Sequence, residues 1–368
     1  MNTQYRQFKE LIEEVDVRNV NGAISDLWGV SIDKKFIRSV ANIIGTDLTK
    51  YKVVSRNQFV CSLMQVSRDE KIPIDRWDSE NDIIVSPAYK VFKVKDSSIV
   101  LPEYLNLWFR RSEFDREASY YGVGGVRGSL EWEDFCEMAL PVPELVEQQE
   151  IVDAYNDIER RIALKRKIND NLAAQAYAIY QDWFIDNGEA HGAIECVLAD
   201  LINILDYKRI PLSSQERAKR AKVYRYFGAA GLLDYVDEYL FDGIYLLVGE
   251  DGSVINEKGY PYLQYVDGKF WVNNHAHILQ GVGDATTELL YLILLKTNIK
   301  EYVTGAVQAK LNQDNLRAIP AIRISKDDMA SFNAIIQPIF AAIRNNNLEI
   351  DNLQVLKASI LTKLTQAN

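Results

Sequence analysis

The sequence is poor in the residues from which catalytic, redox and metal centres are usually built. It contains only three cysteines and three histidines among 368 residues. Cys61, Cys136 and Cys196 are far apart, and no pair has the CxxC spacing that a zinc site or a redox motif needs. We therefore expect three structural thiols in a reducing compartment, with no disulfide framework and no metal.

Sequence motifs of enzymes are also missing. There is no phosphate-binding loop of the GxxxxGK(S/T) kind, no GxSxG turn, and no Asn-Pro-Pro-Tyr or Asp-Pro-Pro-Tyr tetrapeptide. The glycines of 228–231 lack the spacing of a dinucleotide site, and 249–252 is too short for a calcium loop. We expect a non-catalytic chain that binds no cofactor.

No apolar run is long enough to cross a bilayer. The most apolar stretch, Leu289–Leu295, has seven residues, whereas a membrane helix needs about 20. Residues Met1–Asp16 are polar and acidic, unlike a secretion signal. We expect a soluble, cytoplasmic protein with no membrane partner.

Positive charge is in deficit, because the formal net charge is −10. A chain that holds nucleic acid by itself usually carries an excess of Lys and Arg. The acidity counts against tight binding of DNA by the isolated chain, and it is compatible with a reader that works inside a larger assembly.

What the sequence does contain is an internal duplication. A shift of 181 residues places Gly124 and Gly125 on Gly305 and Ala306, Arg127 on Gln308, Leu130 on Leu311, Phe135 on Leu316, and Asn171-Leu172 on Asn352-Leu353. The repeat is about half of the chain, which indicates a duplicated unit and not a solenoid.

A long amphipathic segment closes each half. Apolar residues recur in steps of three and four at Ile151, Tyr155, Ile158, Ile162, Leu172, Ala176 and Ile179, and again at Phe332, Ile336, Ile339, Ile343, Ile350, Leu353, Ile360 and Leu364. Such narrow seams predict coiled-coil packing. Polar residues interrupt both seams (Lys165, Asn169, Asn346, Lys357), and buried polar residues can fix register. Pro338 predicts a kink or a late start of the second helix.

The segment before each helix mixes short strands, turns and helices. Strands are expected at Tyr51–Val54, Ile83–Val85, Tyr89–Val94, Gly243–Gly249, Phe270–Asn273 and Ile322–Ile324, turns at Asp251-Gly252 and Asp267-Gly268, and helices at Leu101–Ser112 and Thr287–Lys296. The predicted fold is α+β: α/β-type domains at 1–143 and 187–325, with long helices at 144–186 and 326–368, related by a pseudo-two-fold repeat.

Several motifs resemble one known family. They are Leu140–Gln149 leading into Ile151-Val152, Tyr180–Phe184, Lys208–Ser213, Tyr226–Ala229, Gly249–Gly252, Asn273–His277 and Thr304–Asn312, where the family often has proline at the position of Ala309. In this order, and with the duplication, they are similar to the specificity subunits of Type I restriction-modification systems. The resemblance covers essentially the whole chain.

The resemblance implies a division of labour. Each globular domain would be a target-recognition domain that reads one half of a split site in double-stranded DNA. The two helices would pack antiparallel as a spacer and dock two methyltransferase subunits, with restriction-translocase subunits added in a restriction complex. S-adenosylmethionine, ATP and magnesium would belong to those partners.

The length of the first helix agrees with a spacer. Residues Ile151–Phe184 as one helix would span about 51 Å. Major-groove faces on one side of B-DNA recur about every 34–36 Å, so the helices are long enough to separate two readers by a turn or more.

A basic segment in the second half is the first candidate for DNA contact. Lys208, Arg209, Arg217, Lys219, Arg220, Lys222 and Arg225 are interleaved with Tyr207, Tyr224 and Tyr226, and only Glu216 opposes them along the chain. Such residues bind phosphates, and Arg can pair with guanine. The alternative is a solvated loop or helix face.

A glycine-led loop is the second candidate. Residues Gly305–Asn312 carry Gln308, Lys310 and Asn312, and the counterpart Gly122–Ser129 carries Gly125 and Arg127. Small residues let backbone approach phosphates, and Gln, Asn and Arg can discriminate bases. The alternative is a tight turn before a strand.

Other candidates are scattered. Asn273 and Asn274 could read adenine edges, although asparagines at strand ends often cap turns. His275 and His277 would share one face of a strand, where such a pair is more often structural than a metal site, and we select Asn274 and His275 for DNA contact. In the first domain we select Lys34, Lys35 and Arg56 in addition to Arg127.

Two other functions fit parts of this pattern. A coiled-coil scaffold without DNA binding would suit the helical seams and the acidity, but not the basic segment or the duplicated loop. A specificity subunit of a related system, in which one polypeptide carries methyltransferase and nuclease, is the nearer alternative. The two domains differ in sequence, so we expect an asymmetric bipartite target.

Overall fold

The computed structural model describes residues 4–39, 46–64, 66–122, 128–305 and 308–364. Two compact units are formed, the first by Met1–Ala163 with Ile350–Asn368 and the second by Leu164–Glu349. The predicted site residues Gly125 and Arg127 lie outside the described residues. No helix in the described ranges is both long enough and apolar enough to span a membrane.

The first unit contains two four-stranded sheets, with strand orders β2-β9-β6-β7 and β4-β3-β8-β5, and the pair β1-β10. Its strands are β1 (Gln4–Gln7), β2 (Ile12–Glu14), β3 (Leu27–Val30), β4 (Phe36–Arg38), β5 (Lys52–Val54), β6 (Phe59–Cys61), β7 (Ile74–Arg76), β8 (Ile83–Val85), β9 (Lys90–Val94) and β10 (Ala139–Val142). Its shorter helices are α1 (Phe8–Leu11), α2 (Val66–Asp69), α3 (Pro102–Phe109), α4 (Ser112–Tyr121) and α5 (Trp132–Glu137). Buried phenylalanines fill the core, where Phe59 stacks on Phe92 at 5.0 Å between ring centroids.

The second unit is built on a six-stranded sheet of order β12-β17-β15-β16-β13-β14, with the separate pair β11-β18. Its strands are β11 (Ile194–Val197), β12 (Ile202–Ile204), β13 (Tyr224–Phe227), β14 (Leu232–Val236), β15 (Phe241–Gly249), β16 (Leu263–Val272), β17 (Ala276–Gly281) and β18 (Pro320–Arg323). Its shorter helices are α7 (Ser214–Ala218), α8 (Thr287–Leu295) and α9 (Gln313–Arg317), with a 3-10 turn η7 (Asp206–Lys208).

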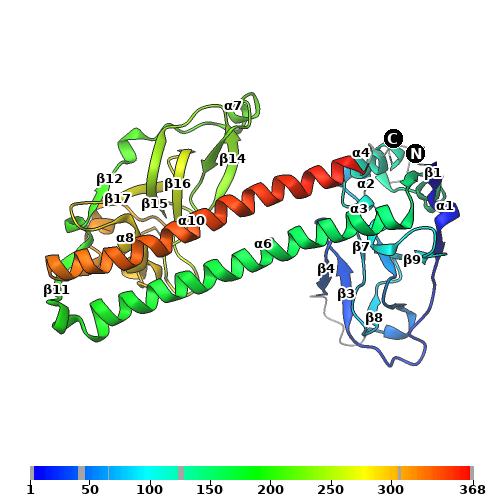
Figure 1. Ribbon diagram of the computed structural model, residues 1–368, viewed down its shortest axis with the longest axis horizontal. Coiled ribbons are helices and arrows are strands. Elements are labelled where there is room, and N and C mark those ends of the chain that lie inside the picture. Colours follow the sequence, from blue (N-terminus) through cyan, green and yellow to red (C-terminus); the bar gives the residue numbers. More distant parts are fainter. Residues whose placement is uncertain (1–3, 40–45, 65, 123–127, 306–307, 365–368) are drawn as a thin grey trace. The chain divides into compact units, whose positions relative to one another are not determined.

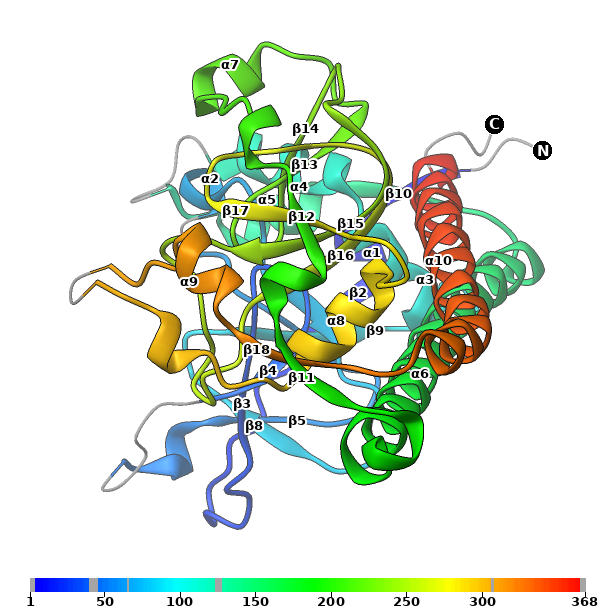
Figure 2. The same ribbon diagram turned by 90° about the vertical axis from the view of Figure 1, so that its left-hand side faces the viewer.

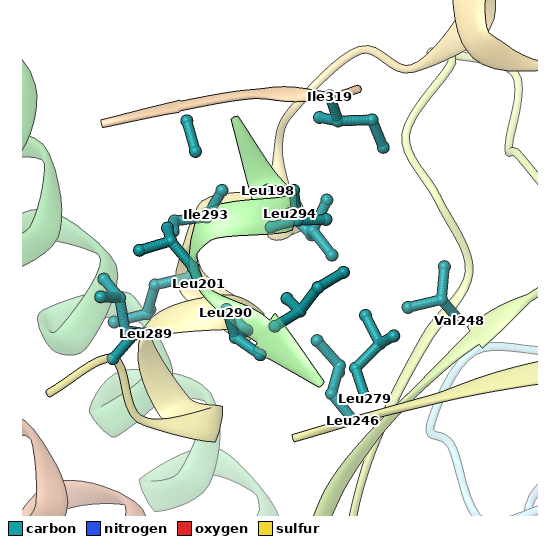
Figure 3. Packing of buried hydrophobic residues seen from close by; sticks show 14 of the residues in the cluster. Leu198, Leu201, Leu246, Val248, Leu279, Leu289, Leu290, Ile293, Leu294 and Ile319 are labelled. Carbon is teal, nitrogen blue, oxygen red and sulfur yellow. The ribbon is translucent and has the colours of Figure 1, made fainter. Parts of the chain in front are cut away.

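Helix α8 forms the centre of the second core because it is apolar all round. Thr286 caps its N-terminus by accepting a hydrogen bond from the Leu289 amide at 3.3 Å. Figure 2 shows α8 beside the sheet, and Figure 3 shows Leu290, Ile293 and Leu294 of α8 in one buried cluster with Leu246 and Leu279 of the sheet. Each fully buried leucine contributes about 1.5–3 kcal/mol, so α8 anchors the sheet.

The long helices α6 (Leu145–Tyr180) and α10 (Lys326–Lys363) lie side by side (Figure 1). In the first unit Ile158 and Ile162 pack with Ile350 and Leu353. In the second, Phe184, just beyond α6, packs edge-on against Phe332 near the start of α10. Residues early in α6 therefore contact residues late in α10, and residues just beyond the end of α6 contact residues early in α10. The expected antiparallel pairing through the predicted seams is confirmed.

The 181-residue duplication is visible in the element boundaries. Strand β18 begins 181 residues after β10, and α10 begins 181 residues after α6. In each half the first strand pairs antiparallel with the strand that precedes the long helix, β1 with β10 and β11 with β18. The α+β fold with duplicated halves is confirmed.

The structure contradicts one local prediction and one branch of another. Asp267-Gly268 lies inside β16 and not at a chain reversal: Gly268 takes a φ of +74° opposite Gly243, which has a φ of +136°, so the glycines mark an irregularity between paired strands. Of the two outcomes that Pro338 predicts, a kink or a late start, the late start is wrong, because α10 begins at Lys326 and continues through Pro338.

Candidate nucleic-acid interface

Arg209 joins the basic segment to the ends of β15 and β17. Its Nη1 donates to the Glu250 carboxylate at 2.6 Å, to the Ala276 carbonyl at 2.8 Å and to the Asn274 carbonyl at 3.3 Å. The side chain is only 13% exposed. Arg209 therefore holds these strand ends together, while Asn274 beside it remains exposed.

Glu250 connects the same strand ends to the glycine loop. Its amide donates to the His275 carbonyl at 2.9 Å, and its carbonyl accepts from the Leu311 amide at 2.8 Å. Its carboxylate lies 3.8 Å from Lys310 Nζ. The predicted loop residue Lys310 and the predicted strand-end residues Asn274 and His275 therefore belong to one surface.

The glycine loop is closed at its base by backbone pairing. Thr304 and Lys310 exchange hydrogen bonds of 2.8 and 2.7 Å. Gly305 has a φ of +94°, and a Cβ there would come within 2.1 Å of the Gln308 carbonyl oxygen, so glycine is required. Gln308 and Lys310 are exposed on this frame.

Asn312 ends the loop and begins α9. Its side chain accepts from the Asn315 amide at 2.7 Å, which is an N-cap. The loop therefore leads into a helix, and not into the strand that a simple tight turn would precede.

A buried polar cluster lies beneath this surface. His277 is 1% exposed, with Nδ1 2.6 Å from the Asp206 carboxylate and Nε2 2.7 Å from the Leu311 carbonyl. Burial opposes the charge on Asp206, but hydrogen bonds from His277 and the Ile278 amide, and the charge of Arg209, leave the pKa of Asp206 below its ordinary value. The carboxylate is therefore ionised inside the protein.

This cluster does not fit a metal ion. Ligand atoms of Asp206, Glu250 and His277 lie within 4.8 Å of one another, which is compatible with a coordination site. However, both ring nitrogens of His277 are engaged, and the Arg209 guanidinium lies 2.6 Å from Glu250 and 3.5 Å from Asp206. Arg209 supplies the positive charge that a cation would bring.

The two strand-end histidines do not share a face, which corrects that prediction. His275 precedes β17, its side chain is 47% exposed, and its Nδ1 lies 2.5 Å from Asp251. His277 is inside β17 and points into the core cluster. Only His275 is available at the surface.

Three cations of the basic segment pair with acidic residues that follow it in the sequence. Arg217 and Lys222 pair with Asp234 at 3.3 and 2.9 Å, and Arg220 pairs with Asp237 at 2.8 Å. Arg225 donates to the Asp267 carbonyl. Lys208 and Lys219 are exposed, and neither forms an ion pair with another described residue. The segment is thus not the unopposed basic patch that the linear sequence predicts.

Tyr226, which the sequence analysis placed at the interface, is buried and does not belong to it. It is 0% exposed, and its hydroxyl accepts from the Leu212 amide at 3.1 Å. The Arg217 guanidinium lies 5.0 Å from its ring. Tyr226 therefore supports the segment from below and cannot reach DNA without unfolding.

In the first unit, Lys34 is also removed from the predicted interface. It is 7% exposed, and its ammonium lies 2.7 Å from Asp115. Burial lowers the pKa of Lys34, and Asp115 partly offsets this. Lys35 and Arg56 are exposed, and Arg56 pairs with Glu80.

The sequence analysis did not select the acidic residues of this surface, or the buried carboxylate and the amide that lie beneath it. Asp206, the pair Glu250-Asp251 and Gln313 come from three stretches that are far apart in the chain, and only Glu250-Asp251 stood in a motif. Gln313 donates to Asp206 at 2.7 Å, so four distant segments meet at one cluster. Local patterns could not have brought them together.

Comparison with known families identifies the chain. The model of the Type I restriction modification DNA specificity domain matches residues 77–174 and again residues 195–324, once in each half. The chain belongs to this family. The first match begins after β7, includes β10 and extends into α6, and the second extends from β11 through β18.

Individual specificity subunits are similar over parts of the chain. A type I restriction enzyme specificity subunit of Haemophilus influenzae is 35% identical over 123 residues, 33% of this chain and 31% of that protein. The MjaIX specificity subunit of Methanocaldococcus jannaschii is 23% identical over 318 residues, 78% of this chain and 73% of that protein. The chain thus aligns with about a third of the Haemophilus relative and most of the archaeal one.

The fold is similar to that of a solved specificity subunit. The crystal structure of a Type-I restriction-modification system S subunit from M. genitalium has a TM-score of 0.58 and covers 99% of this chain and 96% of its own, at 12% identity. The specificity-domain family and this fold agree.

Proposed function

We propose that the chain is the non-catalytic, DNA-reading specificity subunit of a Type I restriction-modification complex. Each half reads one part of an asymmetric bipartite site in double-stranded DNA, and the helix pair α6-α10 docks methyltransferase subunits. The observation that carries the proposal is that the specificity-domain model matches twice, once in each half of a 181-residue duplication. Domain limits of 1–143, 144–186, 187–325 and 326–368 are part of this proposal.

The character of the second-unit surface supports base reading more than phosphate binding. Exposed donors and acceptors of both kinds lie close together, including Asn274, His275, Gln308 and Lys310, with Glu250 and Asp251 among them. Base edges in the major groove present mixed donors and acceptors, whereas phosphates require cations. A surface of this kind discriminates sequences but attracts DNA weakly, which suits a chain of net charge −10 that works with partners.

The long helices supply surfaces for those partners. On α10, Leu348, Val355 and Leu356 are 63, 71 and 51% exposed, and on α6 Leu164 is 58% exposed. These side chains lie away from the seams through which α6 and α10 pack. Apolar side chains presented on a helix are typical of protein docking surfaces. We assign them to methyltransferase subunits, to which restriction-translocase subunits can be added.

The test is a methylome. Single-molecule sequencing is applied to DNA from cells that express this chain with its neighbouring methyltransferase, beside cells that express the methyltransferase alone. We expect adenine methylation in a split, asymmetric motif only when both proteins are present. A perfectly palindromic motif would contradict the reading of two different half-sites.

Matched controls identify the cause of a negative result. Co-purification first establishes that the two proteins assemble. If they assemble and the methylomes are identical, DNA reading fails and a coiled-coil scaffold is favoured. If the motif appears and then shifts in only one half when residues of the second unit are exchanged, reading by halves is supported.

A further inference from the structure

Tyr207 is an exposed aromatic residue on a short turn of the second unit. It is 77% exposed and lies at the middle of the 3-10 turn η7, directly after Asp206, which is only 7% exposed. An exposed ring forgoes the free energy that burial of its apolar surface would provide. Single exposed apolar side chains are common on protein surfaces, so a role for Tyr207 depends on how the turn is held and on what lies beside it.

The chain is anchored immediately before Tyr207. The Leu205 amide donates to the Ile278 carbonyl at 2.9 Å. The Asp206 carboxylate in turn accepts from the Ile278 amide at 2.9 Å and from the Gln313 side chain at 2.7 Å. Because Leu205 and Asp206 are both buried, the start of the turn is fixed to β17 and to the start of α9.

The chain is anchored again soon after Tyr207. The Arg209 side chain holds the ends of β15 and β17, and its Nε also donates back to the Asp206 carbonyl at 3.1 Å. The Ile210 carbonyl accepts from Trp271 Nε1 at 2.6 Å. The backbone is thus fixed on both sides of a side chain that remains in solvent. A group that is held in place before binding loses little conformational entropy on binding, so Tyr207 is pre-organised for a contact.

The turn adjoins the surface to which we assign base reading. Arg209 Nη1 donates to the Asn274 carbonyl at 3.3 Å, so the turn and the strand ends are directly linked. The other exposed side chains that we assign to this surface are polar, namely Asn274, His275, Gln308 and Lys310. Polar groups pair with the donors and acceptors of base edges, but the C5-methyl group of thymine in the major groove requires an apolar partner. Tyr207 provides apolar surface next to these polar groups.

We propose that Tyr207 is a specificity-determining residue of the second half, and that its ring packs against the methyl group of a thymine in the major groove. Lys208 is exposed, and its Nζ lies 5.7 Å from the centroid of the Tyr207 ring. A cation at this place suits the phosphate next to the thymine. The inference rests on the proposed function, since it names the base feature that the same surface reads.

The test removes the methyl group alone. In duplexes that carry the methylated motif, each thymine of the half-site read by the second unit is replaced in turn by deoxyuridine. A half-site that contains a methylated adenine has a thymine opposite it, so the series can always be made. Affinity is measured by fluorescence anisotropy with the complex of the full chain and methyltransferase. One replacement should weaken binding about four-fold, as expected for the loss of one methyl group from an apolar contact.

Variants connect this loss to the ring. Tyr207→Ala should weaken binding of the thymine duplex about ten-fold and should make the complex insensitive to that one replacement, because the partner of the methyl group is gone. Tyr207→Phe keeps the ring and should behave like the unmodified chain in both respects. Tyr235→Ala, at another exposed tyrosine of the same unit, is the matched control and should retain the four-fold sensitivity. Circular dichroism and co-purification with methyltransferase show that each variant is folded and assembled.

The outcomes separate this inference from the proposed function. If the complex binds no duplex with sequence preference, the proposed function fails and the inference fails with it. If the motif is bound but no thymine replacement in this half weakens binding of the unmodified chain, only the contact of Tyr207 with thymine is overturned. Equal sensitivity of Tyr207→Ala and the unmodified chain overturns it as well. Loss of co-purification in Tyr207→Ala would instead place a protein partner on the ring and would likewise overturn the contact with DNA.

Discussion

Lys165 and Asn346 are 181 residues apart, the period of the duplication, and Lys165 Nζ donates to Asn346 Oδ1 at 3.0 Å. They are therefore equivalent positions of the two halves in direct contact. In an antiparallel pair of equivalent helices, equivalent positions meet only at the midpoint. A polar layer that includes Asn169 and Asn347 therefore lies at the centre of the α6-α10 pair. If the two helices paired in a shifted register, these polar side chains would be buried against isoleucines.

The first prediction concerns the cost of this layer. Asn346→Leu should lower the free energy of unfolding by about 1 kcal/mol, because Asn169 loses its donor. The double variant Asn169→Leu with Asn346→Leu should recover much of that loss, because apolar side chains replace both members of the hydrogen-bonded pair. Urea unfolding monitored by circular dichroism measures both, with the exposed Arg160→Ala as control. If the double variant is less stable than the sum of the single effects predicts, the polar layer stabilises the helix pair in addition to fixing its register.

Lys310→Ala should weaken binding of the methylated motif without unfolding the protein, because the Lys310 side chain is 53% exposed. If its ammonium contacts a phosphate, the slope of log affinity against log salt should become less negative by about 0.9. Fluorescence anisotropy at several salt concentrations gives the slope. Lys300→Ala, an exposed lysine of the same unit, is the control, and an equal effect of both variants would argue for a general charge effect.

Tyr226→Phe should distinguish a structural role of this tyrosine from a role in DNA contact. Loss of the hydroxyl leaves the buried Leu212 amide without an acceptor, which should cost about 1 kcal/mol of unfolding free energy. DNA affinity of the folded variant should stay unchanged. Tyr235→Phe, at an exposed tyrosine of the neighbouring strand, should change neither quantity. Lower DNA affinity at full stability for Tyr226→Phe would restore this residue to the interface.

Val355→Asp with Leu356→Asp should abolish co-purification with methyltransferase, because two charges replace apolar side chains that are 71 and 51% exposed. Stability should change by no more than about 0.5 kcal/mol, since exposed substitutions have little effect. Gln354→Asp with Ala358→Asp adds the same charge at exposed neighbouring positions of α10. Loss of assembly in both variants would indicate simple repulsion and not a specific surface.

Features encoded within one segment were predictable. The seams of α6 and α10 recur every three or four residues, and α8 is a single apolar run, so their positions follow from periodicity alone. The glycine of the loop at Gly305 was also recognisable, because its positive φ is a local requirement. Each of these signals is carried by residues close together in the chain.

Features that depend on tertiary contacts between different segments of the chain were not predictable. The basic segment looked unopposed because Asp234 and Asp237 follow it in the sequence and meet it only when β13 and β14 pair. Lys34 looked like a surface lysine, since Asp115, its buried partner, is distant in sequence. The His277 cluster joins four segments, and none of its members has a local pattern that reveals the others.

The core of the first unit is closed by residues from the other end of the chain. Leu364 is buried with Val152 and Tyr155, and Ile360 and Leu361 pack against the same cluster. During synthesis on a ribosome, the apolar surface of the first half that these C-terminal residues cover must therefore stay exposed until the second half has been translated. Premature termination anywhere between the two long helices would damage the half that had already been made, so the folding of both halves depends on one late event.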